Sequence, residues 1–115
     1  MLLSACLMLF GSFGSFNVVQ EWNFTDSSVT TSWQANAHFA DVKIDEDGLY
    51  TRATGWDPFF TCTAVDIAAS PSQCVLIRIK ADMAGKGQLF WTGDTSGQYG
   101  GLSESKRTDF SVAAS

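Results

Sequence analysis

The chain has 115 residues, of which 45% are hydrophobic and 13% aromatic, and its net charge at pH 7 is −5. This length allows at most one ordinary domain. An acidic chain with scattered lysines and arginines lacks the basic stripe that nucleic acid requires, and it suits an anionic membrane surface equally poorly. Nucleic acid is therefore excluded as a partner.

The N-terminal stretch MLLSACLMLFGSFGSF carries no charged side chain and contains an apolar run. The run is too short to span a bilayer as a helix, so no integral membrane segment is predicted. Its length and the Gly and Ser residues that follow it are typical of a secretory signal peptide, although no basic residue precedes it. We predict a signal peptide over residues 1–16, and hence a secreted or cell-surface protein. Two alternatives stay open: a lipid anchor at Cys6, because Leu3-Ser4-Ala5-Cys6 matches a lipobox, and an ordinary buried segment.

After the predicted signal peptide, short apolar and β-branched segments alternate with turn residues. The clearest pattern is in residues 74–80, where every second side chain is β-branched. In residues 40–44, Ala40, Val42 and Ile44 alternate with Asp41 and Lys43, which predicts a strand buried on one face. Between the strands, Asp45-Glu46-Asp47-Gly48 predicts a hairpin turn and Gly85-Lys86-Gly87 another turn. The predicted strands cover residues 18–24, 40–44, 49–54, 59–65, 74–80, 88–92 and 104–112.

No segment keeps a helical period, so the predicted fold class is all-β. Short strands at regular spacing indicate an antiparallel β-sandwich, jelly-roll-like, over residues 17–115, with no linker to a second domain. A strand that ends the chain would be a sheet edge without its neighbour. We therefore interpret the sandwich as incomplete.

Cysteines and acidic residues leave two questions open. Cys62 and Cys74 could form a disulfide in an exported chain, and two reduced buried thiols are the alternative. The acidic turn at residues 45–48 is similar to the start of a calcium loop, but Thr54 stands where an EF-hand needs its bidentate glutamate. A looser structural calcium site that uses carboxylates such as Glu21 or Asp57 stays open.

Catalysis has little support in the sequence. His38 is the only histidine, and no Gly-x-Ser-x-Gly elbow accompanies it. Gly85-Lys86-Gly87 lacks the Ser or Thr and the upstream Gly of a phosphate-binding loop. We predict that the chain is not an enzyme and that His38 is a hydrogen-bonded structural residue.

Four tryptophans, two tyrosines and nine phenylalanines are a heavy aromatic content for one small domain. Most must pack in a core, and mid-strand positions predict burial for Trp22 and Trp91. Trp56, in the Gly-Trp-Asp-Pro corner, and Tyr99, in a glycine-rich loop, are better placed to contact a ligand, since binding residues favour loops. Tyr50 and Arg52 alternate with Leu49 and so face away from the core. Trp56, Arg52, Tyr50 and Tyr99 are the predicted ligand-binding residues.

The spaced aromatic motifs resemble jelly-roll domains of the galactose-binding-like, carbohydrate-binding-module type, found in secreted bacterial proteins. The motifs are Trp22-x-Phe24, Asn36-x-His38, Asp47-Gly48-x-Tyr50, Thr54-Gly55-Trp56-Asp57-Pro58-Phe59 and Gln88-Leu89-Phe90-Trp91-Thr92. The resemblance covers roughly residues 20–112. It implies a non-catalytic module that binds carbohydrate or polysaccharide as part of a larger secreted protein, with further strands after those present. The alternatives are a structural or protein-interaction sandwich and a fragment of a secreted glycan-active enzyme.

Overall fold

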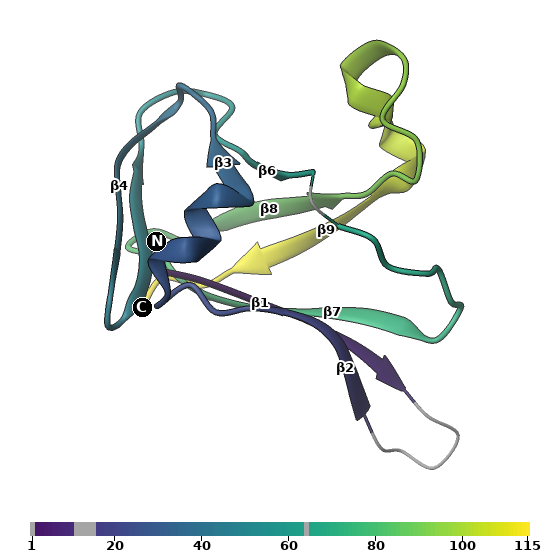
Figure 1. Ribbon diagram of the computed structural model, residues 1–115. Coiled ribbons are helices and arrows are strands. Elements are labelled where there is room, and N and C mark those ends of the chain that lie inside the picture. The colour runs from purple at the N-terminus through teal and green to yellow at the C-terminus, as the bar shows by residue number, and fades with distance from the viewer. Residues whose placement is uncertain (1, 11–15, 64) are drawn as a thin grey trace. The chain divides into compact units, whose positions relative to one another are not determined.

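The computed structural model describes residues 2–10, 16–63 and 65–115, which form short strands and a few 3-10 helical turns (Figure 1). The strands are β1 (Leu2–Phe10), β2 (Phe16–Trp22), β3 (Trp33–Ala35), β4 (Phe39–Asp45), β5 (Gly48–Ala53), β6 (Phe60–Cys62), β7 (Gln73–Lys80), β8 (Gly85–Phe90) and β9 (Arg107–Val112). The helical turns are η1 (Ser27–Thr31), η2 (Gln98–Gly101) and η3 (Glu104–Lys106). The predicted all-β class is confirmed. Within the described residues, no helix has the length and apolar character needed to cross a bilayer.

The chain divides into two compact units, Met1–Ile79 and Lys80–Ser115. In the first unit, one sheet has the order β2-β1-β5-β4, with β7 also paired to β1, and β3 pairs with β6. In the second unit, β8 pairs with β9. All strand pairs with a defined register run antiparallel. The architecture is therefore a set of small antiparallel sheets.

Strand β1 occupies most of the predicted signal peptide. Its backbone pairs with β2 from Ala5 to Phe10 and with β5 at Leu2 and Leu3. The strand therefore joins β2 to the β4–β5 hairpin. Residues 1 and 11–15 of the predicted signal peptide lie outside the described residues, and its cleavage stays a prediction.

The hairpin turn between β4 and β5 is confirmed. Asp45 pairs with Gly48 across a two-residue loop. The Asp45 carboxylate accepts a hydrogen bond of 3.0 Å from the Asp47 backbone N–H, which is the local bond that makes Asp a good turn residue. Gly48 has a φ of 134°, a conformation that side chains with a Cβ rarely adopt.

Strand β4 contains a β-bulge that the sequence did not predict. The pairing shifts between Ala40, which lies opposite Arg52, and Lys43, which lies opposite Tyr50. The expected single buried face of residues 40–44 is therefore wrong in part, because the extra residue reverses the alternation and leaves Val42 exposed. The Ala40 carbonyl instead accepts a hydrogen bond of 3.0 Å from the buried Thr51 hydroxyl.

The core of the first unit contains Phe24 and Leu49. Among residues 17–63 and 65–115, these are the fully buried hydrophobic side chains, at 1% and 2% exposure. The half-buried side chains packed against them are Trp22, Val29, Trp33, Ile44 and Phe60. Strand β7 is confirmed at residues 73–80, but its Val75 is exposed, so its β-branched face is only half-buried.

Two expectations about the second unit are wrong. Gly85-Lys86-Gly87 is not a turn but the start of β8, in which Gly87 lies opposite Phe110. A Cβ at Gly87 would lie 2.3 Å from the Phe110 ring, so the glycine makes room for an aromatic side chain across the pair. The strand ends at Phe90, and Trp91 is 51% exposed rather than buried.

Replacing Leu49 with Ala should lower the free energy of unfolding by about 2–5 kcal/mol, because the side chain is buried and its removal leaves a cavity. The matched control is Leu76→Ala, which removes the same atoms from an exposed position on β7 and should change stability by less than about 0.5 kcal/mol. Urea unfolding of both variants measures the difference, and equal losses would contradict the assigned core.

Candidate functional site

The side-chain amide of Asn36 fixes the corner at residues 55–59. Its Nδ2 donates to the Asp57 carbonyl at 2.7 Å, and its Oδ1 accepts from the backbone N–H groups of Phe59 and His38, each at 3.2 Å. The Asn36 backbone N–H also donates to the Phe59 carbonyl at 3.0 Å. One residue between β3 and β4 therefore satisfies several backbone groups of a loop that has no ladder of its own.

His38 completes the support of this corner. Its Nδ1 lies 2.9 Å from the Asp57 carbonyl oxygen and 3.3 Å from the Asp57 backbone nitrogen. The ring covers Gly55 so closely that a Cβ there would lie 2.5 Å from Cγ of His38. The predicted structural role of His38 therefore has a specific geometry, and Gly55 is the residue that permits it.

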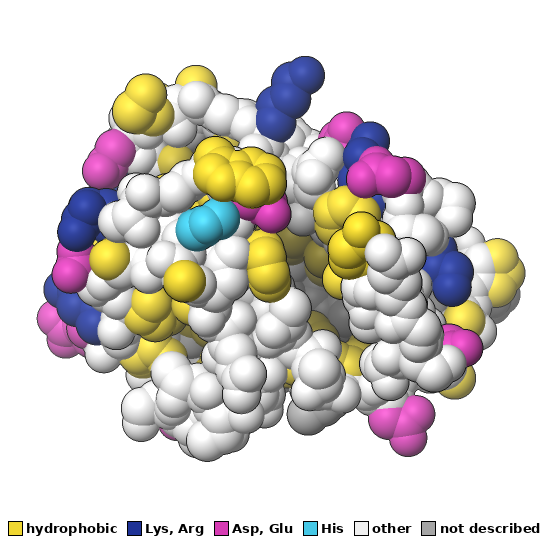
Figure 2. All heavy atoms as spheres, turned by 90° about the horizontal axis from the view of Figure 1, so that it is seen from above, with side chains coloured by type: hydrophobic (Ala, Val, Ile, Leu, Met, Phe, Trp, Pro, Cys, Tyr) yellow, Lys and Arg dark blue, Asp and Glu magenta, His cyan; other side chains and the backbone are white. Residues whose placement is uncertain are grey.

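Trp56 projects from this corner with 89% of its surface exposed, the largest exposure among the large hydrophobic side chains described. Its ring centroid lies 5.8 Å from that of His38, with the two planes tilted by 50°. The space-filling view shows the imidazole at the surface beside a large hydrophobic side chain (Figure 2). The backbone of the corner is therefore held by side-chain hydrogen bonds, while its indole is exposed to solvent.

Arg52 lies on β5 close to the corner and forms an ion pair with Asp41. The Nε–Oδ2 distance is 2.9 Å, and both side chains are 59% exposed. Asp41 belongs to the bulge of β4 and has a φ of 57°, which is uncommon for a residue other than glycine. The pair is solvated, so it contributes little to stability and remains accessible to a ligand.

Tyr50 lies farther along β5, opposite Lys43. The Lys43 ammonium sits 5.0 Å from the centroid of the Tyr50 ring and 3.5 Å from a carboxylate oxygen of Asp45. Tyr50 is 42% exposed. Predicted site residues Tyr50, Arg52 and Trp56 are therefore all accessible and all belong to the first unit.

Tyr99 belongs to the second unit. It is 77% exposed and sits in η2 with a φ of 57°. The loop before it is held by Asp94, whose carboxylate accepts from the Ser96 hydroxyl at 2.6 Å and from the Ser96 N–H at 2.9 Å. These two bonds hold the pKa of Asp94 below its ordinary value, with the hydroxyl bond acting most strongly.

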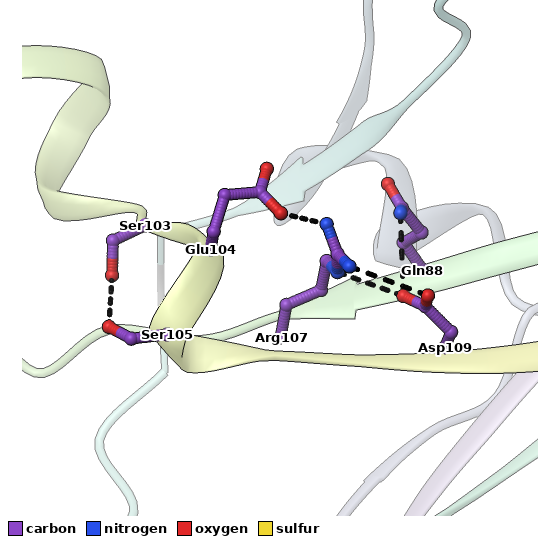
Figure 3. A network of polar contacts seen from close by, with 6 residues as sticks. All are labelled: Gln88, Ser103, Glu104, Ser105, Arg107 and Asp109. Atoms are coloured by element: carbon purple, nitrogen blue, oxygen red, sulfur yellow. Dashed lines mark hydrogen bonds and ion pairs between the residues drawn. The ribbon is translucent and has the colours of Figure 1, made fainter.

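A second polar network in the same unit surrounds Arg107 (Figure 3). The guanidinium pairs with Glu104 and, at 2.9 Å, with the Asp109 carboxylate, which also accepts from Gln88 at 3.3 Å. Both Arg107 and Asp109 are on β9, and Gln88 is on β8. The network ties the β8–β9 pair to η3, and its single guanidinium is shared by the two carboxylates.

Cys62 and Cys74 are half-buried and are not bridged to each other in this structure. Cys62 lies on β6 opposite Trp33, whereas Cys74 lies on β7. Within the described residues, no group of three or more His, Cys, Asp and Glu side chains could hold a metal ion. The disulfide and the calcium site stay predictions.

No protein-family model, curated protein or solved structure matches this chain. The resemblance to galactose-binding-like modules therefore rests on the sequence motifs alone.

Sequence reasoning missed the parts of the site that depend on long-range contacts. Asn36 and His38 were noted for their spacing, but their role as supports of a corner twenty residues away had no local signal. Asp41 was expected to be an ordinary outward-facing strand residue, because a bulge leaves no mark in an alternating sequence. Residues 40–44 alternate regularly in sequence, and this regularity gives no sign of the bulge.

Gly55→Ala should destabilise the first unit by about 1–3 kcal/mol, since the new Cβ would force the His38 ring off the corner. The matched control is Gly85→Ala, where nothing lies within 4 Å of the new Cβ. Thermal unfolding measures stability, and imidazole chemical shifts report displacement of the ring. An unchanged His38 spectrum in the Gly55 variant would contradict the packing described.

Acid should weaken the β4–β5 turn. The Asp47 backbone N–H holds the pKa of the Asp45 carboxyl below its ordinary value of 3.8, and Lys43 acts in the same direction. The unfolded chain keeps the ordinary pKa, so the stabilisation is present above 3.8 and is lost as the pH falls through the lower folded value.

The check is the denaturant midpoint of wild type and Asp45→Asn between about pH 5 and about pH 2. The variant should show the smaller decline, because its amide does not titrate. Some decline should persist, since hydrogen bonds from Ser28 and Ser96 lower the pKa values of Asp26 and Asp94. Identical declines would contradict a role for Asp45.

Proposed function

We propose that this chain is a non-catalytic carbohydrate-binding module of β-sandwich architecture that belongs to a larger exported protein. The observation that carries the proposal is the exposed indole of Trp56 on a corner braced by Asn36 and His38. An indole face binds the apolar C–H face of a sugar ring, and a tryptophan that neither packs in the core nor is free to move is suited to that contact.

Polar groups beside Trp56 support the same proposal. A sugar hydroxyl both donates and accepts hydrogen bonds, so it is recognised best by groups of both kinds. The exposed Asp41–Arg52 pair supplies an acceptor next to a donor. Export and membership in a larger protein are inferred from the sequence resemblance, whereas the N-terminal apolar segment itself forms β1 of the main sheet.

A structural or protein-interaction role is the second candidate. It is favoured by exposed apolar side chains on two strands of the main sheet, Val18 and Val19 on β2 and Val75 and Leu76 on β7. Consecutive residues of a strand point to opposite faces, so each face of the sheet carries exposed apolar side chains that could contact another protein. If the chain has this role, the corner has no binding function and Trp56 has no ligand.

Trp56→Ala should reduce affinity for the bound sugar at least about tenfold, because truncating a central aromatic contact costs on the order of 1.4 kcal/mol or more. Stability should change by less than about 0.5 kcal/mol, given the exposure of the ring. A glycan array identifies the ligand, and calorimetry measures the affinity.

The matched control is Trp91→Ala, which removes an exposed tryptophan that does not belong to the corner and should leave affinity unchanged. Absence of binding to any glycan would overturn the proposal and favour the interaction role. Full affinity in the Trp56 variant would show that the corner is not the site.

A further inference from the structure

We propose that the outward face of the β4–β5 hairpin takes an extended, uncharged oligosaccharide that runs along the strands from Trp56 to Tyr50, with the Asp41–Arg52 pair between them. The proposal rests on the proposed function and specifies its ligand class and the direction in which the ligand lies.

Backbone pairing places these side chains in a row. The Thr54 backbone N–H donates to the His38 carbonyl at 2.8 Å, so these two residues lie opposite each other at the end of the hairpin next to the corner. Arg52 is the next outward residue on β5 and Tyr50 the one after it. The alternate residues point the other way, since Leu49 and Thr51 are buried. His38 with Trp56, Arg52 and Tyr50 therefore follow one another along a single face.

The length of the row exceeds a single sugar. Tyr50 and Thr54 are four residues apart on an extended strand, which corresponds to about 13 Å at roughly 3.3 Å per residue. Exposed aromatic rings lie at both ends, Trp56 at 89% and Tyr50 at 42%, and the Lys43 ammonium lies over one face of the Tyr50 ring, which leaves the other face for a sugar. A monosaccharide stacked on one ring cannot reach the other, whereas a short linear oligosaccharide can contact both.

The bulge in β4 provides the polar middle of the row. The positive φ of Asp41 turns its carboxylate toward the Arg52 guanidinium instead of continuing the regular alternation. Bulges are enriched next to functional sites because they redirect a side chain in this way. The result is an acceptor beside a donor between two aromatic rings, as a hydroxylated ligand requires.

The charges of this face balance. Arg52 is paired with Asp41 and Lys43 with Asp45, so neither cation is left for an acidic sugar. The chain as a whole carries a net charge of −5, which would repel a polyanion. These two observations favour neutral sugars over uronic acids and sulfated glycans.

The test measures the affinity of the full chain for linear oligosaccharides of glucose, xylose, mannose and galactose, from one unit to six. Affinity should rise with length and then level off once the ligand spans the row. Tyr50→Ala should lower affinity for the longest ligand about tenfold, the change that ~1.4 kcal/mol of lost contact gives, and leave the monosaccharide unaffected. Tyr50→Phe keeps the ring and should retain the length dependence.

Three outcomes would overturn the proposal in distinguishable ways. Equal affinity for one unit and six, with no effect of Tyr50→Ala, would restrict the site to the Trp56 corner while the carbohydrate function stands. Tighter binding of glucuronic acid oligomers than of glucose oligomers would refute an uncharged ligand. Binding of no sugar at all would overturn this proposal together with the proposed function.

Discussion

The Asn36 amide is the interaction on which the candidate site depends. Residues 55–59 lie between β5 and β6 and have no strand partner of their own, so their backbone groups need side chains to bond them. Asn36 serves both sides of the corner, through the Asp57 carbonyl and the Phe59 N–H. Without it, Trp56 would sit on a loop free to move, and binding would have to order that loop at a cost in free energy.

The same bracing holds the exposed tryptophan in place without burying it in the core. The cluster around Phe24 and Leu49 contains aromatic contacts, such as Trp22 against Trp33 at 5.3 Å in an edge-to-face arrangement. The buried Nε1 of Trp33 has no hydrogen-bond partner among the described residues, which lowers the net gain from burying that indole. The rigidity of the corner depends on hydrogen bonds more than on burial.

Local chemistry made the strands and the β4–β5 turn predictable. The turn follows from the hydrogen bond that the Asp45 side chain accepts and from the positive φ that Gly48 allows. The alternation from Leu49 to Thr51 can be read from the sequence of that strand alone. What could not be predicted depends on contacts across strands. Gly87 looked like a turn residue, because only the partner strand reveals that Phe110 needs its space. The bulge at Asp41 could not be predicted for the same reason, since register is a property of a pair of strands.

The candidate site shows the same division between local and distant information. Alternation alone predicted that Tyr50 and Arg52 face away from Leu49, and corner chemistry alone predicted an accessible Trp56; all three are exposed. Neither pattern could indicate that His38 packs beside Trp56, or that a bulge turns Asp41 toward Arg52. These two unpredicted contacts convert separate exposed residues into a continuous face with a braced aromatic end and a polar middle. The proposed ligand contact surface therefore depends on the β4–β5 pairing and its adjoining corner, and not on the aromatic content that first suggests it.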